Sequence, residues 1–316
     1  MSFEIIGTGS HLPAKIVTNQ DFEKIVDTSD EWITQRTGIR QRYFVGEGER
    51  NVDMGTEAAR RAIAMAGVDI QSIDAIIAGT CTNEAAIPSL ACQIQRALGI
   101  ERCFAFDVNA ACSGFIFALK TAERFLTETC KTILVIGGDT MSRFLNMEDR
   151  DSCILFGDGA GAAVIRKGTR CRSFALHSRP DVHETLDMAG ANARRDGQFV
   201  PSFISLKGRE VYAFATRELE TIIRDGLRAC NLTVNDVSLF ILHQANLRII
   251  QSVAQRLGLS MDAFYTNIAE VANTSAGCIP IALDQANREG KLHSGDILVM
   301  AGVGGGLTSG CAVYEW

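Results

Sequence analysis

The sequence predicts an α/β protein made of two similar halves, each a mixed β-sheet with helices, packed together as a layered sandwich. Short apolar runs of strand length alternate along the chain with amphipathic runs of helical length. The second half repeats the order of these segments at an offset of about 164 residues. We expect the halves to span residues 1–170 and 171–316.

The first half alternates strands and helices. Strands are expected at 5–9, 73–79, 102–108 and 132–138, and a further strand up to 165 follows a glycine turn that starts at 156. Helices are expected at 19–26, 30–36, 56–67, 88–98 and 114–126. Gly38 ends the short helix at 30–36, and Gly99 caps the helix at 88–98. The continuous apolar run at 132–138 is typical of a strand covered on both faces.

The second half follows the same order. Helices are expected at 217–229, 248–257 and in the turn and helix at 273–283, and strands at 237–242, 296–302 and 310–313. Ordinary α/β chains share coarse periodicity, so a chance match is the alternative. Agreement in order, element type and offset favours a duplication. It would bring the ends of equivalent strands and helices together between the halves.

Composition excludes several classes of function. The 316 residues carry a net charge of −6, which gives no reason to expect nucleic acid as a partner. No apolar run reaches the ~18 residues that a membrane span requires. Ten cysteines at irregular spacing, with no secretory signal, indicate reduced thiols in the cytoplasm. Because no C-x-x-C pair occurs, we expect no structural zinc.

Cys112 has the setting of a reactive thiol. Only small residues separate the strand before it from the helix that begins near Gly114, so we expect an accessible sulfur at a helix N-terminus. The helix dipole would favour the thiolate and lower the pKa from its free value of ~8.5. The alternative is that Cys112, like most free cysteines, packs as a small hydrophobe.

Two other polar residues end or begin equivalent elements. His243 directly follows the apolar strand at 237–242, at the strand end where α/β sheets usually bind ligands. Asn273 stands just before a helix, at the counterpart of the Cys112 turn. The packed histidine and the helix N-cap are the structural alternatives. The repeat predicts that Cys112, His243 and Asn273 meet between the halves.

A glycine-rich segment, Gly304-Gly-Gly-Leu-Thr308, precedes the last strand. Consecutive glycines permit unusual backbone angles and can aim N–H groups at a developing oxyanion. No Lys-Ser or Lys-Thr follows, which excludes a P-loop. The glycines at 157–161 match a dinucleotide fingerprint only loosely, because a strand follows them.

Together these motifs resemble β-ketoacyl-acyl carrier protein synthase III, a condensing enzyme of the thiolase superfamily. They are Ala-Ala-Cys112-Ser-Gly, His243-Gln-Ala-Asn, Ala-Asn273-Thr-Ser-Ala, Gly-Gly-Gly-Leu-Thr308, Leu155-Phe-Gly-Asp-Gly-Ala-Gly-Ala and Asp30-Glu-Trp-Ile-Thr-Gln-Arg-Thr-Gly-Ile-Arg40. The match runs in order from Ile5 to the C-terminus. It implies a duplicated thiolase-like fold with α-β-α-β-α layers.

The resemblance also implies the reaction. Cys112 would take an acyl group from acyl-CoA, and His243 and Asn273 would stabilise the enolate formed when malonyl-acyl carrier protein loses CO₂. The N–H groups of Cys112 and of one glycine, for which we favour Gly305, would hold the tetrahedral oxyanion. Acyl-CoA and malonyl-acyl carrier protein are substrates, and no cofactor or metal is expected.

Partner contacts are assigned by the same resemblance. Thr28, Trp32, Arg36 and Arg150 would contact CoA, with solvated charges and an anchored tryptophan as the ordinary alternative. The segment Gln244, Ala245, Asn246, Leu247 and Arg248 would dock the carrier protein. A homodimer is implied, and the apolar strand at 104–106 is a candidate interface.

Three positions depart from the family's bulkier residues: Ile87 before Pro-Ser, Val303 before the glycines, and Ser309 after Leu-Thr. We expect a roomier acyl pocket that accepts branched or longer starters, unless Phe199, Phe203 or Met300 fills the space. Two other functions stay open. One is a related condensing enzyme of secondary metabolism, and the other is a non-catalytic carrier-binding scaffold.

Overall fold

Two five-stranded mixed sheets frame the protein in the computed structural model, which describes residues 2–190 and 193–316. The first sheet has the order β1 (Ser2–His11), β7 (Asp158–Gly168), β6 (Thr132–Thr140), β4 (Ala75–Gly79), β5 (Phe104–Val108). The second has the order β8 (Cys171–Ser178), β16 (Thr308–Glu315), β15 (Ile297–Gly304), β13 (Leu239–Leu242), β14 (Phe264–Tyr265).

The two sheets have the same connectivity. In each, the first three strands of that order pair antiparallel and the last three pair parallel. The predicted duplication and mixed sheets are therefore confirmed. We propose residue 170 as the boundary between the halves, since β7 ends at Gly168 and β8 begins at Cys171.

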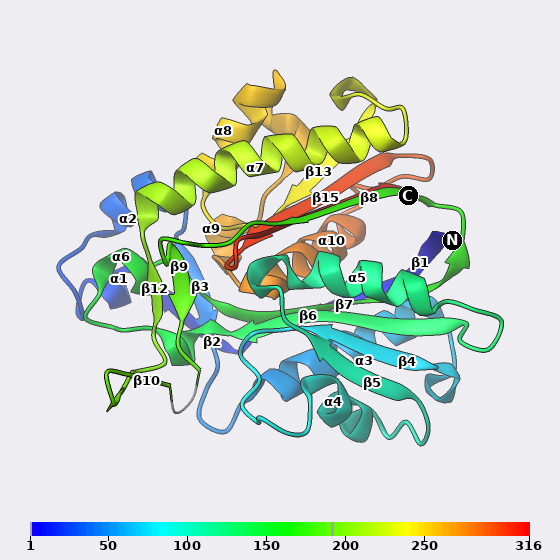
Figure 1. Ribbon diagram of the computed structural model, residues 1–316, viewed down its shortest axis with the longest axis horizontal. Helices are drawn as coiled ribbons and strands as arrows, with labels where there is room; N and C mark the ends of the chain where they lie inside the picture. Colours follow the sequence, from blue (N-terminus) through cyan, green and yellow to red (C-terminus); the bar gives the residue numbers. More distant parts are fainter. Residues whose placement is uncertain (1, 191–192) are drawn as a thin grey trace.

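Helices form the other three layers of an α-β-α-β-α sandwich (Figure 1). Between the sheets lie α5 (Gly114–Phe125) and α10 (Cys278–Arg288), whose buried apolar residues join the core with both sheets. The outer faces are covered by α3 (Asn51–Ala66) and α4 (Leu90–Leu98) on the first sheet, and by α7 (Gly208–Ala229) and α8 (Leu247–Leu257) on the second. No helix of the described residues is long and apolar enough to cross a membrane.

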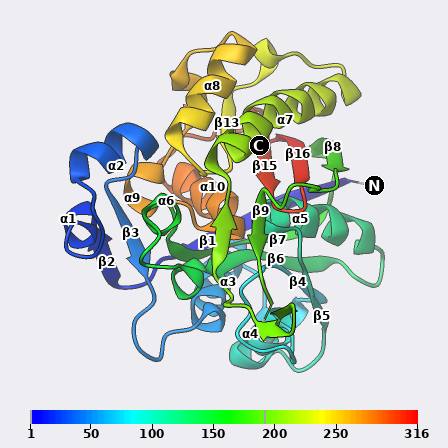
Figure 2. The same cartoon turned by 60° about the vertical axis from the view of Figure 1, so that its left-hand side comes forward.

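Shorter elements gather at one end of the sandwich, the side that comes forward in Figure 2. They are β2 (Lys15–Thr18), α1 (Asn19–Phe22), α2 (Asp30–Thr37), β3 (Gln41–Phe44), α6 (Arg150–Cys153), β9 (Leu186–Met188), β10 (Arg194–Arg195), β11 (Gln198–Phe199), β12 (Ile204–Leu206) and α9 (Ile268–Val271). Single 3₁₀ turns are η1 (Ile70–Ser72), η2 (Ala111–Ser113), η3 (Met141–Phe144), η4 (Val234–Asp236), η5 (Met261–Ala263) and η6 (Ser275–Gly277). A separate apolar cluster holds much of this end together.

Several elements differ from their predictions. The α7 helix begins at Gly208 rather than at 217, and α3 begins at Asn51 rather than at 56. The β8 strand was not predicted, because its half-buried residues mix polar and apolar types and give a weak pattern. The helix expected at 19–26 ends at Phe22, and the hairpin of β2 and β3 was also not predicted.

Candidate active site

Cys112 lies in η2, the tight turn that joins β5 to α5. Ala111 before it has a φ of 47°, a left-handed conformation that non-glycine residues rarely adopt. The turn is closed by Ser113, whose N–H and Oγ both donate to the Ala110 carbonyl at 3.2 and 2.8 Å. Cys112 is only 8 % exposed, yet its side chain lines a cavity of about 310 Å³.

The second half contains a matching turn, η6, which leads into α10. Ser275, at the position equivalent to Ala111, has a φ of 53°. Its Oγ donates to Cys112 Sγ at 3.4 Å and its N–H donates to Asn273 Oδ1 at 2.9 Å. Ser275 therefore links the nucleophile candidate of one half to the asparagine of the other.

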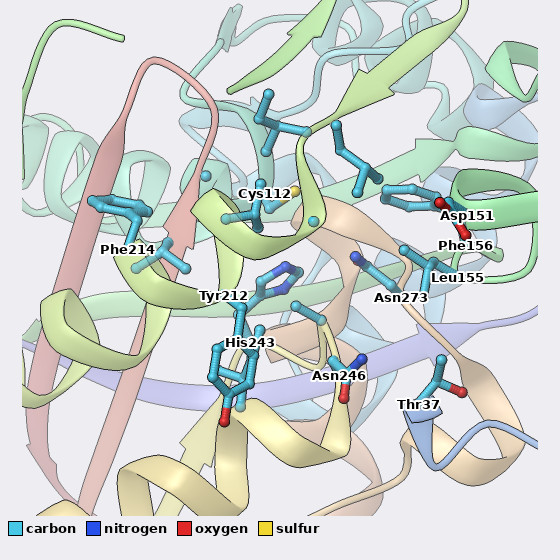
Figure 3. A pocket seen from close by; sticks show the side chains of 18 of the residues that line it. Thr37, Cys112, Asp151, Leu155, Phe156, Tyr212, Phe214, His243, Asn246 and Asn273 are labelled. Carbon is cyan, nitrogen blue, oxygen red and sulfur yellow. The ribbon is translucent and has the colours of Figure 1, made fainter. Parts of the chain in front are cut away.

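His243 follows β13, and its N–H donates to the Ala301 carbonyl of β15 at 2.8 Å. The side chains of Cys112, His243 and Asn273 lie around one cavity (Figure 3). The predicted meeting of these three residues is thus what the structure shows. Burial lowers the pKa of His243 to about 4, so its imidazole is neutral near pH 7. A neutral ring donates from one nitrogen and accepts at the other, and Nδ1 has no partner among the described residues.

The expected thiolate at Cys112 is wrong, because the structure favours the protonated thiol. Burial raises the pKa of the thiol to about 12, and the hydrogen bond from Ser275 opposes this rise only in part. The sulfur is also less accessible than the small neighbouring residues suggested. Burial disfavours the charged form more than a helix N-terminus favours it.

The segment from Gly304 to Thr308, called here the glycine loop, packs directly against the Cys112 turn. A Cβ on Gly304 would lie 2.8 Å from the Cys112 nitrogen and 2.9 Å from the Ala110 carbonyl oxygen, so only glycine fits. Thr308 Oγ1 donates to the Ala110 carbonyl at 3.1 Å. Gly304 and Leu307 line the cavity, and Gly305 lies between them in the chain without lining it.

The mouth of the cavity collects residues expected to contact CoA. Trp32 and Arg36 line it, and the guanidinium groups of Arg36 and Arg150 lie 5.7 and 4.7 Å from the Trp32 ring centroid. Arg150 also donates to the Asp27 carbonyl at 2.8 Å. Thr28 does not line the cavity; its Oγ1 is buried and has no partner among the described residues.

Of the three positions expected to widen the acyl pocket, only Val303 lines this cavity. Ile87 is 87 % exposed and does not line the cavity of the single chain, so its role in the acyl pocket stays a prediction. Ser309 is buried and turned toward Glu218, to which its Oγ donates at 2.9 Å. Phe199, Phe203 and Met300 do not line the cavity either: both phenylalanines are exposed, and Met300 lies in the core.

The segment expected to dock the carrier protein is only partly available. Gln244 is fully buried, where its amide donates to the carbonyls of Leu242 and Tyr265, so its predicted role in docking is wrong. Asn246 caps α8 by accepting from the Arg248 N–H at 2.9 Å. Asn246 and Ala245 line the cavity, Leu247 is partly buried, and Arg248 is exposed beside the mouth.

Sequence reasoning missed part of the cavity wall. Residues of α7 and of the short strands line it, namely Leu186, Leu206, Gly208, Val211, Tyr212 and Phe214. The spacing of Val211, Tyr212 and Phe214 is a helical signal that would have extended α7 toward Gly208. Ser275 belongs to the motif Ala-Asn273-Thr-Ser-Ala, but the sequence does not show its left-handed backbone or its contact with Cys112.

A cysteine at the start of a buried helix, a neutral histidine and an asparagine now share one cavity between two duplicated halves. This constellation on a thiolase-like fold defines a class of enzyme that transfers acyl groups through a cysteine thioester. No cluster of metal-ligating side chains occurs among residues 2–190 and 193–316.

Comparison with known proteins identifies the family within this class. The family described as 3-oxoacyl-[acyl-carrier-protein (ACP)] synthase III matches residues 106–180, and its C-terminal family matches residues 227–316. The beta-ketoacyl-[acyl-carrier-protein] synthase III of Desulfotalea psychrophila is 42 % identical over 324 residues and covers 100 % of both chains. That of Clostridium acetobutylicum is 43 % identical over 322 residues, covering 100 % of this chain and 99 % of its own.

Solved structures agree. The 3-oxoacyl-[acyl-carrier-protein] synthase III from Aquifex aeolicus superposes with a TM-score of 0.94 at 40 % identity, covering all of both chains. The priming beta-ketosynthase from the R1128 polyketide pathway gives 0.93 at 31 % identity, covering 99 % of this chain and 96 % of its own. The chain belongs to the 3-oxoacyl-[acyl-carrier-protein] synthase III family and is an acyltransferase, which confirms the family and the enzyme class predicted from its motifs.

Proposed function

We propose that Cys112, His243 and Asn273 carry out the reaction of this family in two steps. The reaction is the condensation of an acyl-CoA with malonyl-acyl carrier protein that initiates fatty acid synthesis. One observation carries the assignment: the three side chains face a single cavity, which Trp32 and Arg36 also line.

The first step transfers the acyl group to the enzyme. The Cys112 sulfur attacks the thioester carbonyl, the carbonyl oxygen becomes an oxyanion, and the intermediate collapses as CoA leaves with the thiol proton. The Cys112 N–H and the N–H of the peptide that joins Gly304 to Gly305 are the proposed oxyanion donors. Packing of Gly304 against the Cys112 turn supports this choice.

The second step forms the carbon–carbon bond. Malonyl-acyl carrier protein loses CO₂, and its thioester oxygen gains the charge of an enolate, which the neutral His243 ring and the Asn273 amide stabilise as donors. The enolate carbon attacks the acyl-Cys112 carbonyl. The sulfur leaves as a thiolate, takes a proton from solvent, and releases 3-oxoacyl-carrier protein.

Variants separate the two steps. Cys112→Ala should abolish condensation of acetyl-CoA with malonyl-acyl carrier protein and retain some release of CO₂ from the malonyl thioester. His243→Ala and Asn273→Ala should instead lose CO₂ release, with acyl transfer to Cys112 less affected. Equal loss of acyl transfer in all three variants would contradict this division of roles.

The substrate contacts are proposals that rest on the mouth of the cavity. Trp32 would stack on the adenine of CoA, and Arg36 and Arg150 would supply charge. Thr28, just before α2, is the fourth proposed contact. Exposed Arg248 would meet the acidic carrier protein beside Ala245, Asn246 and Leu247. Arg248→Glu should then raise KM for the malonyl-carrier protein without changing KM for acyl-CoA.

The starter acyl group is proposed to be short, with branched or longer chains accepted. Val303 and the apolar residues Phe156, Leu186 and Leu206 line the cavity near Cys112. A series of straight and branched acyl-CoA substrates tests this proposal through kcat/KM. Strict preference for acetyl-CoA would contradict it.

A homodimer is proposed to form through the edge of the first sheet. Edge strand β5 carries Phe104, 39 % exposed, which contacts Phe106 and the exposed Phe125 of α5. An aromatic cluster on a free strand edge is a surface that a second strand can cover. Sedimentation should show a dimer, and Phe104→Glu should shift the protein toward monomer.

A cytoplasmic location is proposed for the protein.

A related role in secondary metabolism is the second candidate. The similarity to the R1128 priming beta-ketosynthase favours it, because that protein belongs to a polyketide pathway. The two roles share the chemistry at Cys112 and differ in their carrier protein. Comparing kcat/KM with carrier proteins of fatty acid synthesis and of polyketide synthesis separates them.

A further inference from the structure

Glu218 of α7 is a buried carboxyl group that is not among the residues assigned to catalysis or substrate binding. Glu218 is 3 % exposed and meets three partners from the second sheet and its connections. Its Oε1 accepts from Ser309 Oγ at 2.9 Å and lies 3.4 Å from His177 Nδ1, and its Oε2 lies 3.1 Å from Arg179 Nη2. A buried carboxylate is tolerated only with such partners, and losing them is costly.

Two of these partners lie at the C-terminal end of the glycine loop, where β16 pairs with β8. Ser309 directly follows Thr308 at the start of β16. Arg179 pairs with the loop through its backbone: its N–H donates to the Leu307 carbonyl at 2.8 Å, and the Leu307 N–H donates to its carbonyl at 2.6 Å. Glu218 thus fixes both the strand that leaves the loop and the segment that pairs with it.

The loop in turn contacts the turn that holds the nucleophile. Thr308 Oγ1 lies 2.8 Å from Ser113 Oγ and donates to the Ala110 carbonyl at 3.1 Å. Gly304 has no room for a side chain against the Cys112 nitrogen. A shift of the loop would therefore move the glycine N–H relative to Cys112, and small displacements of such donors reduce rates strongly.

We propose that Glu218 is a positioning residue that holds the glycine loop against the Cys112 turn from the outer helix layer. In Figure 1, α7 lies over β8 and β15 on the outer face of the second sheet. Two of the Glu218 partners belong to this sheet, His177 in β8 and Ser309 in β16. The inference rests on the proposed function, because it assigns the loop to acyl transfer. It predicts a loss confined to the step that uses the loop.

The experiment compares Glu218→Gln with Glu220→Gln on the same helix. Glu220 pairs with Arg224 and Arg256 at the surface and does not contact the glycine loop, so it controls for the loss of one charge from α7. Each protein is assayed for acylation of Cys112 by acetyl-CoA, followed by intact mass, and for CO₂ release from malonyl-carrier protein. Glu218→Gln should slow acylation about ten-fold or more and change CO₂ release by less than about three-fold. Glu220→Gln should leave both rates unchanged.

Ser309→Ala provides a second test if Glu218→Gln folds poorly. It removes one hydrogen bond and leaves the Arg179 contact, so its effect on acylation should be smaller in the same direction. The effects of Ser309→Ala and Glu218→Gln should be non-additive in the double variant.

Equal losses in acylation and CO₂ release would overturn the inference, since a structural defect affects both steps alike. Wild-type acylation rates in both Glu218→Gln and Ser309→Ala would also overturn it. If the unmodified enzyme forms no acyl adduct on Cys112, the proposed function fails, an outcome distinguishable from a failure of the variants alone.

Discussion

The sulfur of Cys112 lies at the N-terminal end of α5, and burial raises the pKa of its thiol to about 12. A helix N-terminus stabilises a charge by up to ~2 kcal/mol, or roughly 1.5 pKa units. Burial can shift a pKa by ~3–5 units in the opposite direction. Hence the thiol is protonated at neutral pH.

Alkylation of Cys112 should report this raised pKa directly. The thiolate is the reactive form, and well below the pKa its fraction grows about ten-fold for each pH unit. We expect modification by iodoacetamide, followed by peptide mapping, to rise at that rate from pH 7 to pH 9. A rate that levels off near pH 7 would show a thiolate at neutral pH and would contradict the role given to burial.

Ser275 opposes the effect of burial through its hydrogen bond to the sulfur. Ser275→Ala removes the Oγ donor 3.4 Å from Cys112 Sγ and keeps the N–H that holds Asn273. Acylation of Cys112 should slow by about five- to ten-fold, because one hydrogen bond of ~1 kcal/mol to the attacking sulfur is lost. CO₂ release at His243 and Asn273 should stay near the wild-type rate. An unchanged acylation rate would contradict the proposed role of the Ser275 hydrogen bond in acylation of Cys112.

At the scale of elements, the glycine loop and the η2 turn act as one unit. A methyl group on Gly304 would lie 2.8 Å from the Cys112 nitrogen, a distance that real side chains do not adopt. Because the nearest atoms belong to the backbone, neither the glycine loop nor the turn can move aside as a flexible side chain could. The close approach of β15 to the turn is therefore a requirement of the site.

Gly304→Ala should push the loop away from the Cys112 turn. Acylation should fall at least ~100-fold, the range seen when an oxyanion donor is lost. Gly190→Ala is the matched control, because a Cβ there meets nothing within 4 Å among the residues that the structure describes. The acylation rate of both variants is measured by intact-mass spectrometry of samples quenched at successive times. Wild-type acylation by Gly304→Ala would contradict the loop's assignment.

Sequence patterns predicted the elements that carry the three central side chains and missed others for physical reasons. Strands β4, β6 and β13 are buried apolar runs with a clear signal. The first turns of α7 line the cavity and hold none of the helix's fully buried residues, which begin at Ala215, so the strongest helical signal starts later in the chain. Gln244 looked like a docking residue because sequence does not show that its amide closes a buried turn.

At the scale of the whole molecule, the site depends on how the halves meet. Asp139 of β6 accepts four hydrogen bonds at Oδ1 from its own half: Thr80 Oγ1, Thr82 Oγ1 and the N–H groups of Cys81 and Thr82. Its Oδ2 accepts from the Ala276 N–H of the other half at 3.0 Å. One carboxyl group therefore joins the two halves beside the Ser275 turn, η6, which contacts Cys112.

Asp139→Asn should weaken this junction. An amide nitrogen placed at Oδ2 would face the Ala276 N–H, leaving a buried donor without an acceptor at a cost of about 1–3 kcal/mol. Chemical denaturation should show that loss of unfolding free energy. Asp225→Asn, which breaks only a surface pair with Arg228, should change it by less than ~1 kcal/mol. Equal stability of the two variants would contradict the role of Asp139.

The internal repeat was the sequence feature that predicted most about the site. An offset of about 164 residues relates Ala111 to Ser275, and both residues have left-handed backbones. It predicted that Cys112 and Asn273 begin equivalent turns. It did not show how deeply the sulfur is buried, since burial depends on packing by distant parts of the chain, such as Gly304 and Ser275 against the Cys112 turn.

The most direct test of the account is the mass of the protein after brief incubation with acetyl-CoA. We expect one acetyl group per chain, mapped to Cys112, retained in His243→Ala and Asn273→Ala and absent in Cys112→Ala. The adduct should disappear when malonyl-acyl carrier protein is added, as 3-oxoacyl-carrier protein forms. No adduct with any acyl-CoA, or an adduct that persists in Cys112→Ala, would contradict the central claim that Cys112 carries the acyl group.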